Sequence, residues 1–258
     1  MNEKQPKSPD SGEASDTCHE TNVPPAPPIP VGKDSWSSRI HEGLAMAWHE
    51  NRRFFLVLAS ILFFKSAVAD LSSISGASML PTLLDGDKVW VNKLAYDVKV
   101  PFTEINLAEV GEPARGDIVI IDSSRAGKRL IKRIVGLPGD TVVMQSNALS
   151  INGQIVAQEI VERDEDAIII TEALPDATHL AQLTDSYVSR SRRSYGPVVV
   201  PEGRYFVLGD NRDNSADSRA YSFIPREEII GRSSSVVFSN DSEKSYLFRS
   251  DRFFSSLE

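Results

Sequence analysis

The sequence predicts a mainly β protein: an antiparallel, barrel-like domain that carries an inserted polar lobe and follows one membrane-spanning helix and a disordered tail. Three observations support this prediction. After residue 70 the chain consists of short runs rich in Val and Ile, separated by Gly, Pro and Asp turns, with no long helical period between them. This pattern is typical of antiparallel sheets and barrels. Before residue 70 lies one long apolar segment, and before residue 36 the chain is polar and rich in proline.

The chain begins with a polar segment, residues 1–35, that is rich in Pro, Ser, Asp and Glu. Such a composition buries too little apolar surface to fold, so we expect a disordered tail. Residues 36–53 show a weak helical period in Ile40, Leu44 and Trp48. This period predicts a short amphipathic helix that lies against an apolar surface.

Residues 54–70 form the apolar segment, which Arg52-Arg53 precedes. The segment is shorter than the roughly 20 residues that an upright spanning helix needs. However, Lys65 near its far end can extend its amine to the lipid headgroups. The positive-inside rule places the tail in the cytoplasm and everything after residue 70, the exported domain, outside. The alternative is a buried helix of a soluble core; a cleaved signal peptide does not fit, because the apolar stretch starts too far from the first residue.

The composition argues against two kinds of function. The 258 residues carry a formal charge of −8, which argues against nucleic acid binding, because that function needs a basic face. The single cysteine, Cys18, allows neither an intramolecular disulfide nor a thiolate metal site. The sequence also has no His-Glu-x-x-His motif and no His/Cys cluster for zinc, and it has no phosphate-binding glycine loop.

The stretch Ser75-Gly-Ala-Ser-Met-Leu-Pro-Thr-Leu-Leu84 contains a candidate nucleophile, Ser78. Gly76 lets the backbone approach a bound group closely. Pro81 donates no backbone hydrogen bond and biases Leu80 towards an extended conformation. We therefore expect the hydroxyl of Ser78 to be presented in a tight turn, with an ordinary polar turn residue as the alternative.

A serine nucleophile needs a base, and elimination leaves a lysine. Three of the four histidines precede the predicted span, and the fourth, His179, falls in the polar insert, so a Ser-His-Asp triad is improbable. Among the exported lysines, Lys132 has apolar neighbours, Leu130 and Ile134, on its own face of a predicted strand. Burial there can lower its pKa by several units from about 10.4, as a lysine base requires. The alternative is a surface lysine on an edge strand.

A third constellation is the polar loop Gly209-Asp-Asn-Arg-Asp-Asn-Ser-Ala-Asp-Ser-Arg219. Its Asp, Asn and Ser side chains can satisfy the backbone of the loop by hydrogen bonds. Asp213 and Asp217 could each pair with Arg212 or Arg219. Such ion pairs would order the loop and hold Ser215 at a fixed place. The alternative is a calcium-like or merely solvated turn, although the EF-hand pattern is not met.

An inserted lobe is predicted for residues of about 146–203. This part is more polar than its surroundings, with an acidic cluster at Glu162–Asp166 and a basic one at Arg190–Arg193.

In this order the motifs resemble bacterial type I signal peptidase (leader peptidase), a family of serine proteases with a Ser-Lys dyad. The resemblance covers most of residues 70–240. It comprises the Ser78 stretch with Gly86-Asp87, then Arg115-Gly-Asp-Ile-Val119, then Lys132-Arg-Ile-Val-Gly-Leu-Pro-Gly-Asp140, then the polar loop. Four such motifs in register behind a membrane anchor are highly specific.

The resemblance implies a membrane-anchored serine endopeptidase without metal or cofactor, with a mostly β catalytic core and an inserted, β-rich cap lobe. Ser78 would be the nucleophile and Lys132 the general base. Ser215 would hydrogen-bond to the lysine and orient it, and Asp217 and Arg219 would form a supporting ion pair. The substrates would be secretory preproteins with small residues at the first and third positions before the cut. Cleavage would take place at the outer face of the bacterial cytoplasmic membrane.

Two features depart from the family pattern. Many Gram-negative relatives place a serine two residues before the nucleophile, where it donates to the oxyanion hole; here, as in other branches of the family, that position is Gly76. The hole would then use the N–H of Ser78 and a second donor, Ser75 or a water. The second departure is the single anchor, because some relatives carry two.

Three residues are candidates for lining the substrate pockets: Ile74, Leu83 and Ile131. The candidates for touching lipid are Met79, Leu80 and Phe253-Phe254, with core packing as the alternative.

Two rival functions stay open at this point. A self-cleaving repressor-type Ser-Lys protease shares the dyad, but it would carry a DNA-reading helix pair and lack the anchor. A membrane-anchored β domain that binds a partner without chemistry would use the same loops only as structure.

Overall fold

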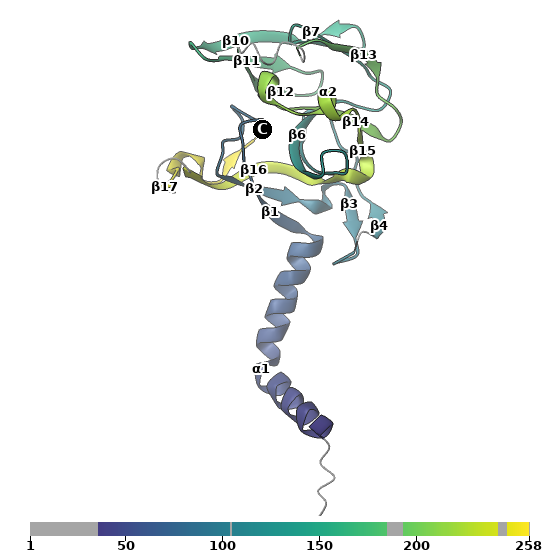
Figure 1. Ribbon diagram of the computed structural model, residues 1–258, viewed down its shortest axis with the longest axis vertical. Helices are drawn as coiled ribbons and strands as arrows, with labels where there is room; N and C mark the ends of the chain where they lie inside the picture. Colours follow the sequence, from purple (N-terminus) through teal and green to yellow (C-terminus); the bar gives the residue numbers. More distant parts are fainter. Residues whose placement is uncertain (1–35, 104, 185–192, 242–246, 258) are drawn as a thin grey trace, which may run out of the picture. The chain divides into compact units, whose positions relative to one another are not determined.

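The computed structural model describes residues 36–103, 105–184, 193–241 and 247–257; the predicted tail, residues 1–35, lies outside the described residues. The chain divides into two compact units, Met1–Arg52 and Arg53–Glu258, and the division falls within its long helix. The second unit contains every described strand (Figure 1). Its sheets are antiparallel, which confirms the predicted mainly β class.

The helix α1 spans Trp36–Ala67 and includes residues that the sequence assigns to two segments, 36–53 and 54–70. It ends before the predicted span does, so residues 69 and 70 lie in strand β1 (Ala69–Ser73) instead. From residue 51 to its end, its exposed large apolar side chains are Phe54, Phe55, Leu56, Val57, Leu58, Ile61, Leu62, Phe63 and Phe64. None of the helices within the described residues combines the length and the hydropathy of a candidate membrane span.

The largest sheet has the strand order β1-β2-β16-β5-β6-β14-β15, and two further short strands, β17 and β18, pair with β16. β16 organises this sheet, because it pairs with β2, β5, β17 and β18 along its 13 residues. The bounds are β2 (Asp87–Asn92), β5 (Ile118–Ser123), β6 (Lys128–Gly136), β14 (Arg204–Leu208), β15 (Ile224–Pro225), β16 (Ile229–Asp241), β17 (Leu247–Phe248) and β18 (Ser255–Ser256).

β5 lies between two apolar clusters. The four residues Ile118–Ile121 are all buried, because alternate side chains of a strand point to opposite faces and here both faces are covered. One cluster adds buried residues of β6 and β14. The other adds Met79 and Leu83, which fix the segment between β1 and β2 against the sheet. Met79 therefore belongs to the core, whereas Phe253 and Phe254 are exposed.

The inserted lobe lies between β6 and β14 in sequence and is β-rich. It consists of two antiparallel sheets with the orders β10-β11-β12 and β13-β7-β8-β9. Its strands begin at Thr141, ahead of the predicted boundary at about 146. A third apolar cluster joins residues of this lobe to β6 and β14 through Val135, Phe206 and Leu208. The bounds are β7 (Thr141–Gln145), β8 (Ala148–Ile151), β9 (Gln154–Ile155), β10 (Ala157–Arg163), β11 (Ile168–Ala173), β12 (Thr178–Leu183) and β13 (Tyr195–Val199).

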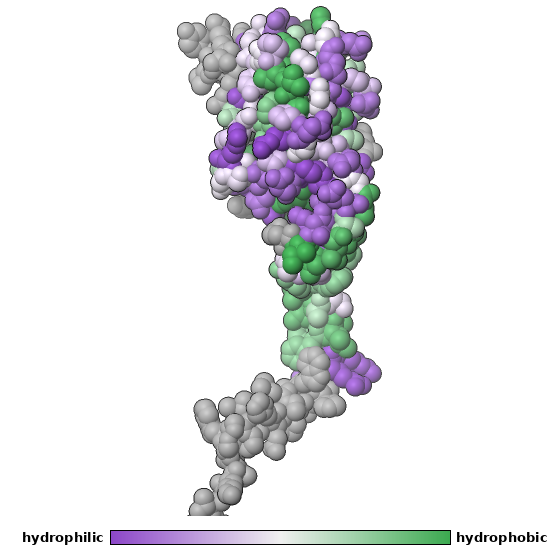
Figure 2. Space-filling model, turned by 90° about the vertical axis from the view of Figure 1, so that its right-hand side faces the viewer, coloured by the Kyte–Doolittle hydropathy of each residue, from purple (hydrophilic) through white to green (hydrophobic). Residues whose placement is uncertain are grey.

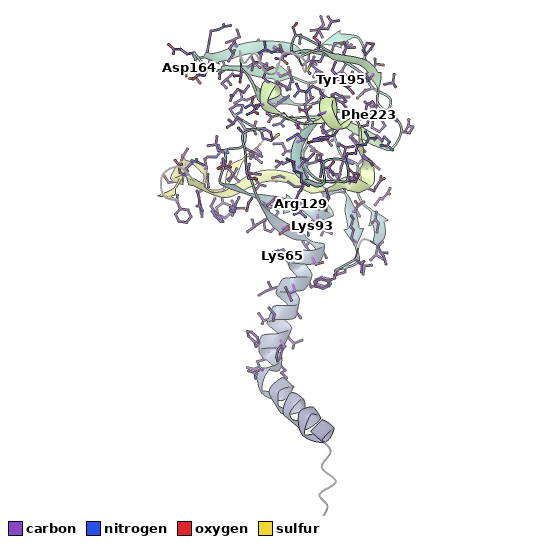
Figure 3. All side chains as sticks on the ribbon, in the orientation of Figure 1. Lys65, Lys93, Arg129, Asp164, Tyr195 and Phe223 are labelled. Carbon is purple, nitrogen blue, oxygen red and sulfur yellow. The ribbon has the colours of Figure 1, made fainter. Side chains whose placement is uncertain are left out.

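A two-stranded hairpin, β3 (Asp97–Lys99) and β4 (Asn106–Glu109), lies beside the end of α1 (Figure 1). The backbone N–H of Phe102 in its tip donates to Ser66 Oγ over 2.8 Å. Lys93 Nζ donates to the carbonyls of Lys65 and Ser66 and so satisfies groups that the helix end leaves open (Figure 3). The short helices are η1 (Lys93–Ala95), η3 (Arg212–Asn214), α2 (Ser218–Tyr221), η4 (Arg226–Glu228) and η5 (Ser250–Arg252).

Candidate active site

Ser78 lies on the segment between β1 and β2, which buried apolar side chains fix against the sheet. Asn211, from the polar loop, holds the same turn. Its backbone N–H donates to the carbonyl of Ser78 over 3.2 Å, and its side-chain Nδ2 donates to the carbonyl of Ala77 over 3.0 Å. Two hydrogen bonds from one loop residue thus restrain the backbone that carries the hydroxyl.

Gly76 takes a backbone conformation that explains why glycine stands there. Its φ is +95°, in a region that L side chains rarely adopt, and no atom lies within 4 Å of the place of an added Cβ. Its N–H donates to Asp85 Oδ1 over 2.8 Å. A serine at this position would therefore meet backbone strain rather than a steric clash.

Lys132 and Ser78 meet directly. Lys132 Nζ lies 2.8 Å from Ser78 Oγ and 2.7 Å from the carbonyl oxygen of Ile131. The lysine is 3% exposed, and Leu130 and Ile134 on the same strand are buried with it. Burial lowers the pKa of Lys132 from 10.5 to about 8, against the charges of Asp217 and Asp210, which raise it. An amine with this pKa is partly uncharged near neutral pH, so it can accept a proton from the hydroxyl.

Asp217 and Arg219 form a buried pair in the polar loop. Arg219 Nη2 donates to Asp217 Oδ2 over 2.7 Å and its Nε donates to Oδ1 over 2.8 Å. Burial alone would raise the pKa of Asp217, but the hydrogen bonds and the charge of Arg219 hold it below its usual range. Ser215 is 3% exposed, and its Oγ lies so near Gly209 that an added Cβ there would be 2.3 Å from it. The predicted hydrogen bond from Ser215 to the lysine stays a prediction.

A second buried pair, Arg133 with Asp210, was not expected from the sequence. Arg133 Nε and Nη2 donate to the two carboxylate oxygens of Asp210 over 2.9 and 2.7 Å. Thr82 Oγ1 also donates to Asp210 over 2.6 Å. Asp210 therefore joins the strand of the lysine to the segment of the serine. The sequence offered one signal for this pair: an arginine, Arg133, stands directly after Lys132 in an apolar predicted strand.

A cleft of about 380 Å³ opens beside Ser78 and Lys132. Two strand edges without a partner strand border it. Among the pairings of the described chain, β1 pairs only with β2, and β14 pairs with β6 only from Arg133 onward. The first half of β6 is thus open on the cleft side. The lining residues are Ser72, Ser73, Ile74, Ser75, Gly76, Ala77, Ser78, Ile120, Lys128, Arg129, Leu130, Ile131, Lys132, Asn214 and Ala216.

The cleft brings together some of the predicted pocket residues. Ile74 and Ile131 line it, and so do Ser75 and Gly76. Leu83 is fully buried and packs in the core cluster rather than along the cleft.

His179 lies apart from the dyad, in a buried charged cluster. Its Nε2 is 3.4 Å from Glu172 Oε2 and 3.3 Å from Arg212 Nη2. Burial, with the positive charge of Arg133, lowers the pKa of His179 to about 4, so the ring is neutral at neutral pH. Within the described residues, no group of three or more His, Cys, Asp and Glu side chains is placed to hold a metal ion.

Comparisons with known proteins agree on one family. A family model described as "Signal peptidase, peptidase S26" matches residues 47–238. A signal peptidase I from Pseudomonas aeruginosa is 34% identical over 205 residues, which cover 73% of this chain and 71% of that protein. A signal peptidase I from Bacillus amyloliquefaciens is 33% identical over 192 residues, covering 74% and 85%.

Two further matches extend the comparison. The signal peptidase I T of Bacillus subtilis is 37% identical over 167 residues, covering 64% of this chain and 72% of that protein. The crystal structure of a signal peptidase I from Enterococcus faecalis is 30% identical, with a TM-score of 0.31, and the match covers 48% of this chain and 98% of that one.

Proposed function

This chain belongs to the signal peptidase family, peptidase S26, whose members are serine peptidases that remove signal peptides, and on that premise we propose that Ser78 is its nucleophile and Lys132 its general base. One observation carries this proposal: the amine of a buried lysine lies 2.8 Å from the hydroxyl of the serine. The family match favours this function over a repressor-type protease and over a binding domain without chemistry.

The proposed reaction has two stages. Ser78 Oγ attacks the carbonyl carbon of the scissile bond while Lys132 Nζ takes its proton. The resulting ammonium then protonates the leaving amine, and an acyl-enzyme forms. In the second stage Lys132 removes a proton from a water that attacks the ester. The bond to Ser78 Oγ then breaks, Lys132 gives its proton to Ser78 Oγ, and the signal peptide is released. At a pKa of about 8, about one lysine in ten is uncharged at pH 7.

The oxyanion that forms in each stage needs donors. We assign the N–H of Ser78 as one donor. Ser75 lines the cleft and is exposed, so its hydroxyl or a water is the second donor that we propose. The N–H of Gly76 is a poorer candidate, because it already donates to Asp85.

The substrate is proposed to bind as an extended strand between β1 and the first half of β6. A peptide there would use backbone groups of two open strand edges, which is a recurring mode of peptide recognition. Ile74 and Ile131 line this cleft and would leave room only for small side chains at the first and third positions before the cut. The preferred substrates are therefore secretory preproteins.

The lipid bilayer is the second proposed partner. Residues 54–67 would anchor the chain in the bacterial cytoplasmic membrane, with residues 1–53 on the cytoplasmic side and the catalytic domain, residues 71–258, outside. Exposed apolar side chains between Arg52-Arg53 and Lys65 support this assignment. The apolar surface continues from α1 onto the adjoining end of the domain (Figure 2). Ser78 lies eight positions after Asp70, so an extended chain holds it within roughly 30 Å of the membrane.

A cleavage assay tests the catalytic proposal. The detergent-solubilised chain should cut a preprotein, and both Ser78→Ala and Lys132→Ala should abolish the cut while the fold survives. Lys99→Ala is the matched control, because Lys99 lies on β3, outside the residues that line the cleft. Retained cleavage in Lys132→Ala would remove the lysine from the mechanism.

A further inference from the structure

A buried ion pair joins the inserted lobe to the polar loop. Arg212, which follows Asn211 in the loop, donates from Nη1 to Glu172 Oε1 over 2.9 Å and from Nη2 to Glu172 Oε2. Both side chains are 0% exposed. Burial alone would raise the pKa of Glu172, but the charge of Arg212 holds it below its usual range, so the pair is ionic. Glu172 lies on β11 and is not among the residues that line the cleft.

The next strand of the lobe holds the same stretch of loop. On β12, the backbone N–H of Gln182 donates to the carbonyl of Asp210 over 2.8 Å, and Gln182 pairs with Asn211 in an isolated parallel bridge. His179 on the same strand contacts both members of the Glu172–Arg212 pair. The lobe therefore holds three consecutive loop residues, 210–212.

Two of those three residues, Asp210 and Asn211, also hold the segments that carry the dyad. Asn211 makes both hydrogen bonds to the Ser78 turn, to the carbonyls of Ser78 and Ala77. Asp210 binds Arg133, the neighbour of Lys132, and accepts a hydrogen bond from Thr82. The loop is thus a link with the lobe on one side and both reacting groups on the other.

We infer that Glu172, with His179 and Gln182, positions the nucleophile through the loop, so that the inserted lobe is part of the catalytic apparatus and not only a cover. This inference rests on the proposed function, because it takes Ser78 as the nucleophile. Its physical basis is the cost of breaking a buried ion pair. When one partner is removed, the charge of the other stays buried without compensation, which is strongly unfavourable. The loop then moves to solvate that charge, and Asn211 moves with it. A misplacement of a reacting atom by about 1 Å can lower a rate by about 10²-fold.

The test compares Glu172→Gln with Glu159→Gln in the full-length chain in detergent. Glu159 is an exposed residue of the neighbouring strand β10 and serves as the matched control. The measurements are kcat and KM on a preprotein and the rate at which a small serine-directed acylating probe labels the chain. We expect Glu172→Gln to lower kcat and the labelling rate by about tenfold or more, with KM changed less than about twofold, and Glu159→Gln to leave all three unchanged.

A double-mutant cycle separates positioning from general loosening of the fold. Because Glu172 is inferred to act through Asn211, Glu172→Gln should add little to the loss of labelling rate in Asn211→Ala. Should Glu172→Gln fail to fold, the double variant Glu172→Gln/Arg212→Gln replaces the ion pair with neutral amides and leaves no buried charge unpaired. A fall in kcat and labelling is still expected for this variant, although a smaller one than for Glu172→Gln, because the ionic link between lobe and loop is lost but no unpaired charge displaces the loop.

Three results would overturn the inference. A folded Glu172→Gln or double variant that keeps the wild-type labelling rate and kcat would show a role in stability alone. A rise in KM with unchanged labelling would place Glu172 in substrate binding. Labelling that persists in Ser78→Ala, run in parallel, would overturn the proposed function and this inference with it, whereas unchanged labelling in Glu172→Gln overturns the inference alone.

Discussion

Lys132 acquires its proposed role from its surroundings, because a solvated lysine is charged at neutral pH. The strand β6 carries it between buried apolar residues, and burial lowers its pKa to about 8. Asp217 and Asp210 oppose this effect, so the loop that holds the dyad also limits how far the pKa falls. The balance leaves a base whose pKa is close to working pH, which is favourable for general base catalysis.

The pH dependence of cleavage tests this balance. Because the uncharged amine is the active form and its pKa is lowered to about 8, kcat/KM should fall about tenfold per pH unit on acidification below pH 8. The measurement is a pH–rate profile between pH 5 and pH 9. The same limb should persist in His179→Asn, since that ring is neutral throughout this range above a pKa of about 4. An activity that stays constant down to pH 6 would contradict the lysine base.

Gly76 offers a second test at the residue scale. Its φ of +95° predicts that Gly76→Ala and Gly76→Ser each lower the free energy of unfolding by about 1 kcal/mol through backbone strain. Thermal or denaturant unfolding measures this loss. If a hydroxyl at this position reaches the oxyanion, Gly76→Ser should have the higher kcat of the two. Equal stability of both variants and wild type would contradict the strain.

At the scale of elements, we predict that the hairpin β3–β4 touches the membrane, because it exposes large apolar side chains. All four residues of β4 are exposed. Large exposed apolar side chains cluster in and beside it: Phe102, Ile105, Leu107 and Val110. The hydrogen bond from Phe102 to Ser66 ties the tip to the end of α1. Lys65 and Lys93 lie at the same junction, where their charges would meet lipid headgroups (Figure 3).

A fluorescence experiment tests this contact. In a Cys18→Ser background, an environment-sensitive dye on Phe102→Cys should be quenched by spin-labelled lipids after reconstitution into vesicles. The control is Ile155→Cys on β9, where the parent side chain is 80% exposed but lies in the inserted lobe. Equal quenching at both positions, or none at Phe102→Cys, would contradict insertion of the hairpin.

At the scale of the whole molecule, the proposed topology places the tail and the catalytic domain on opposite sides of the membrane. The basic Arg52-Arg53 pair before the apolar segment predicts this orientation. The single natural cysteine, Cys18, is a ready reporter of the tail. In spheroplasts, an impermeant thiol reagent should leave Cys18 unlabelled and should label Val199→Cys, whose parent residue is 62% exposed, made in the Cys18→Ser background. Labelling of Cys18 without permeabilisation would reverse the proposed topology.

Much of the fold was within reach of the sequence, because it depends on local patterns. Runs of β-branched residues between turn formers predicted antiparallel sheets, and that class is confirmed. Composition predicted a polar insert from about residue 146, and the structure has two antiparallel sheets between β6 and β14, beginning at Thr141. The boundary between helix and β1 was also displaced, since apolar residues suit either element and tertiary pairing decides between them.

By itself, the sequence determined which residue types were available for chemistry: one presented serine, one lysine among apolar neighbours, and no histidine suited to a triad. Those inferences need only side-chain chemistry and nearest neighbours. Only the tertiary structure decided which groups meet, because the deciding contacts join residues far apart in the chain. Asp210 lies 128 positions from Thr82, Asn211 lies 134 from Ala77, and Arg212 lies 40 from Glu172. No local period encodes such pairs; packing of the lobe, the loop and the sheet selects them.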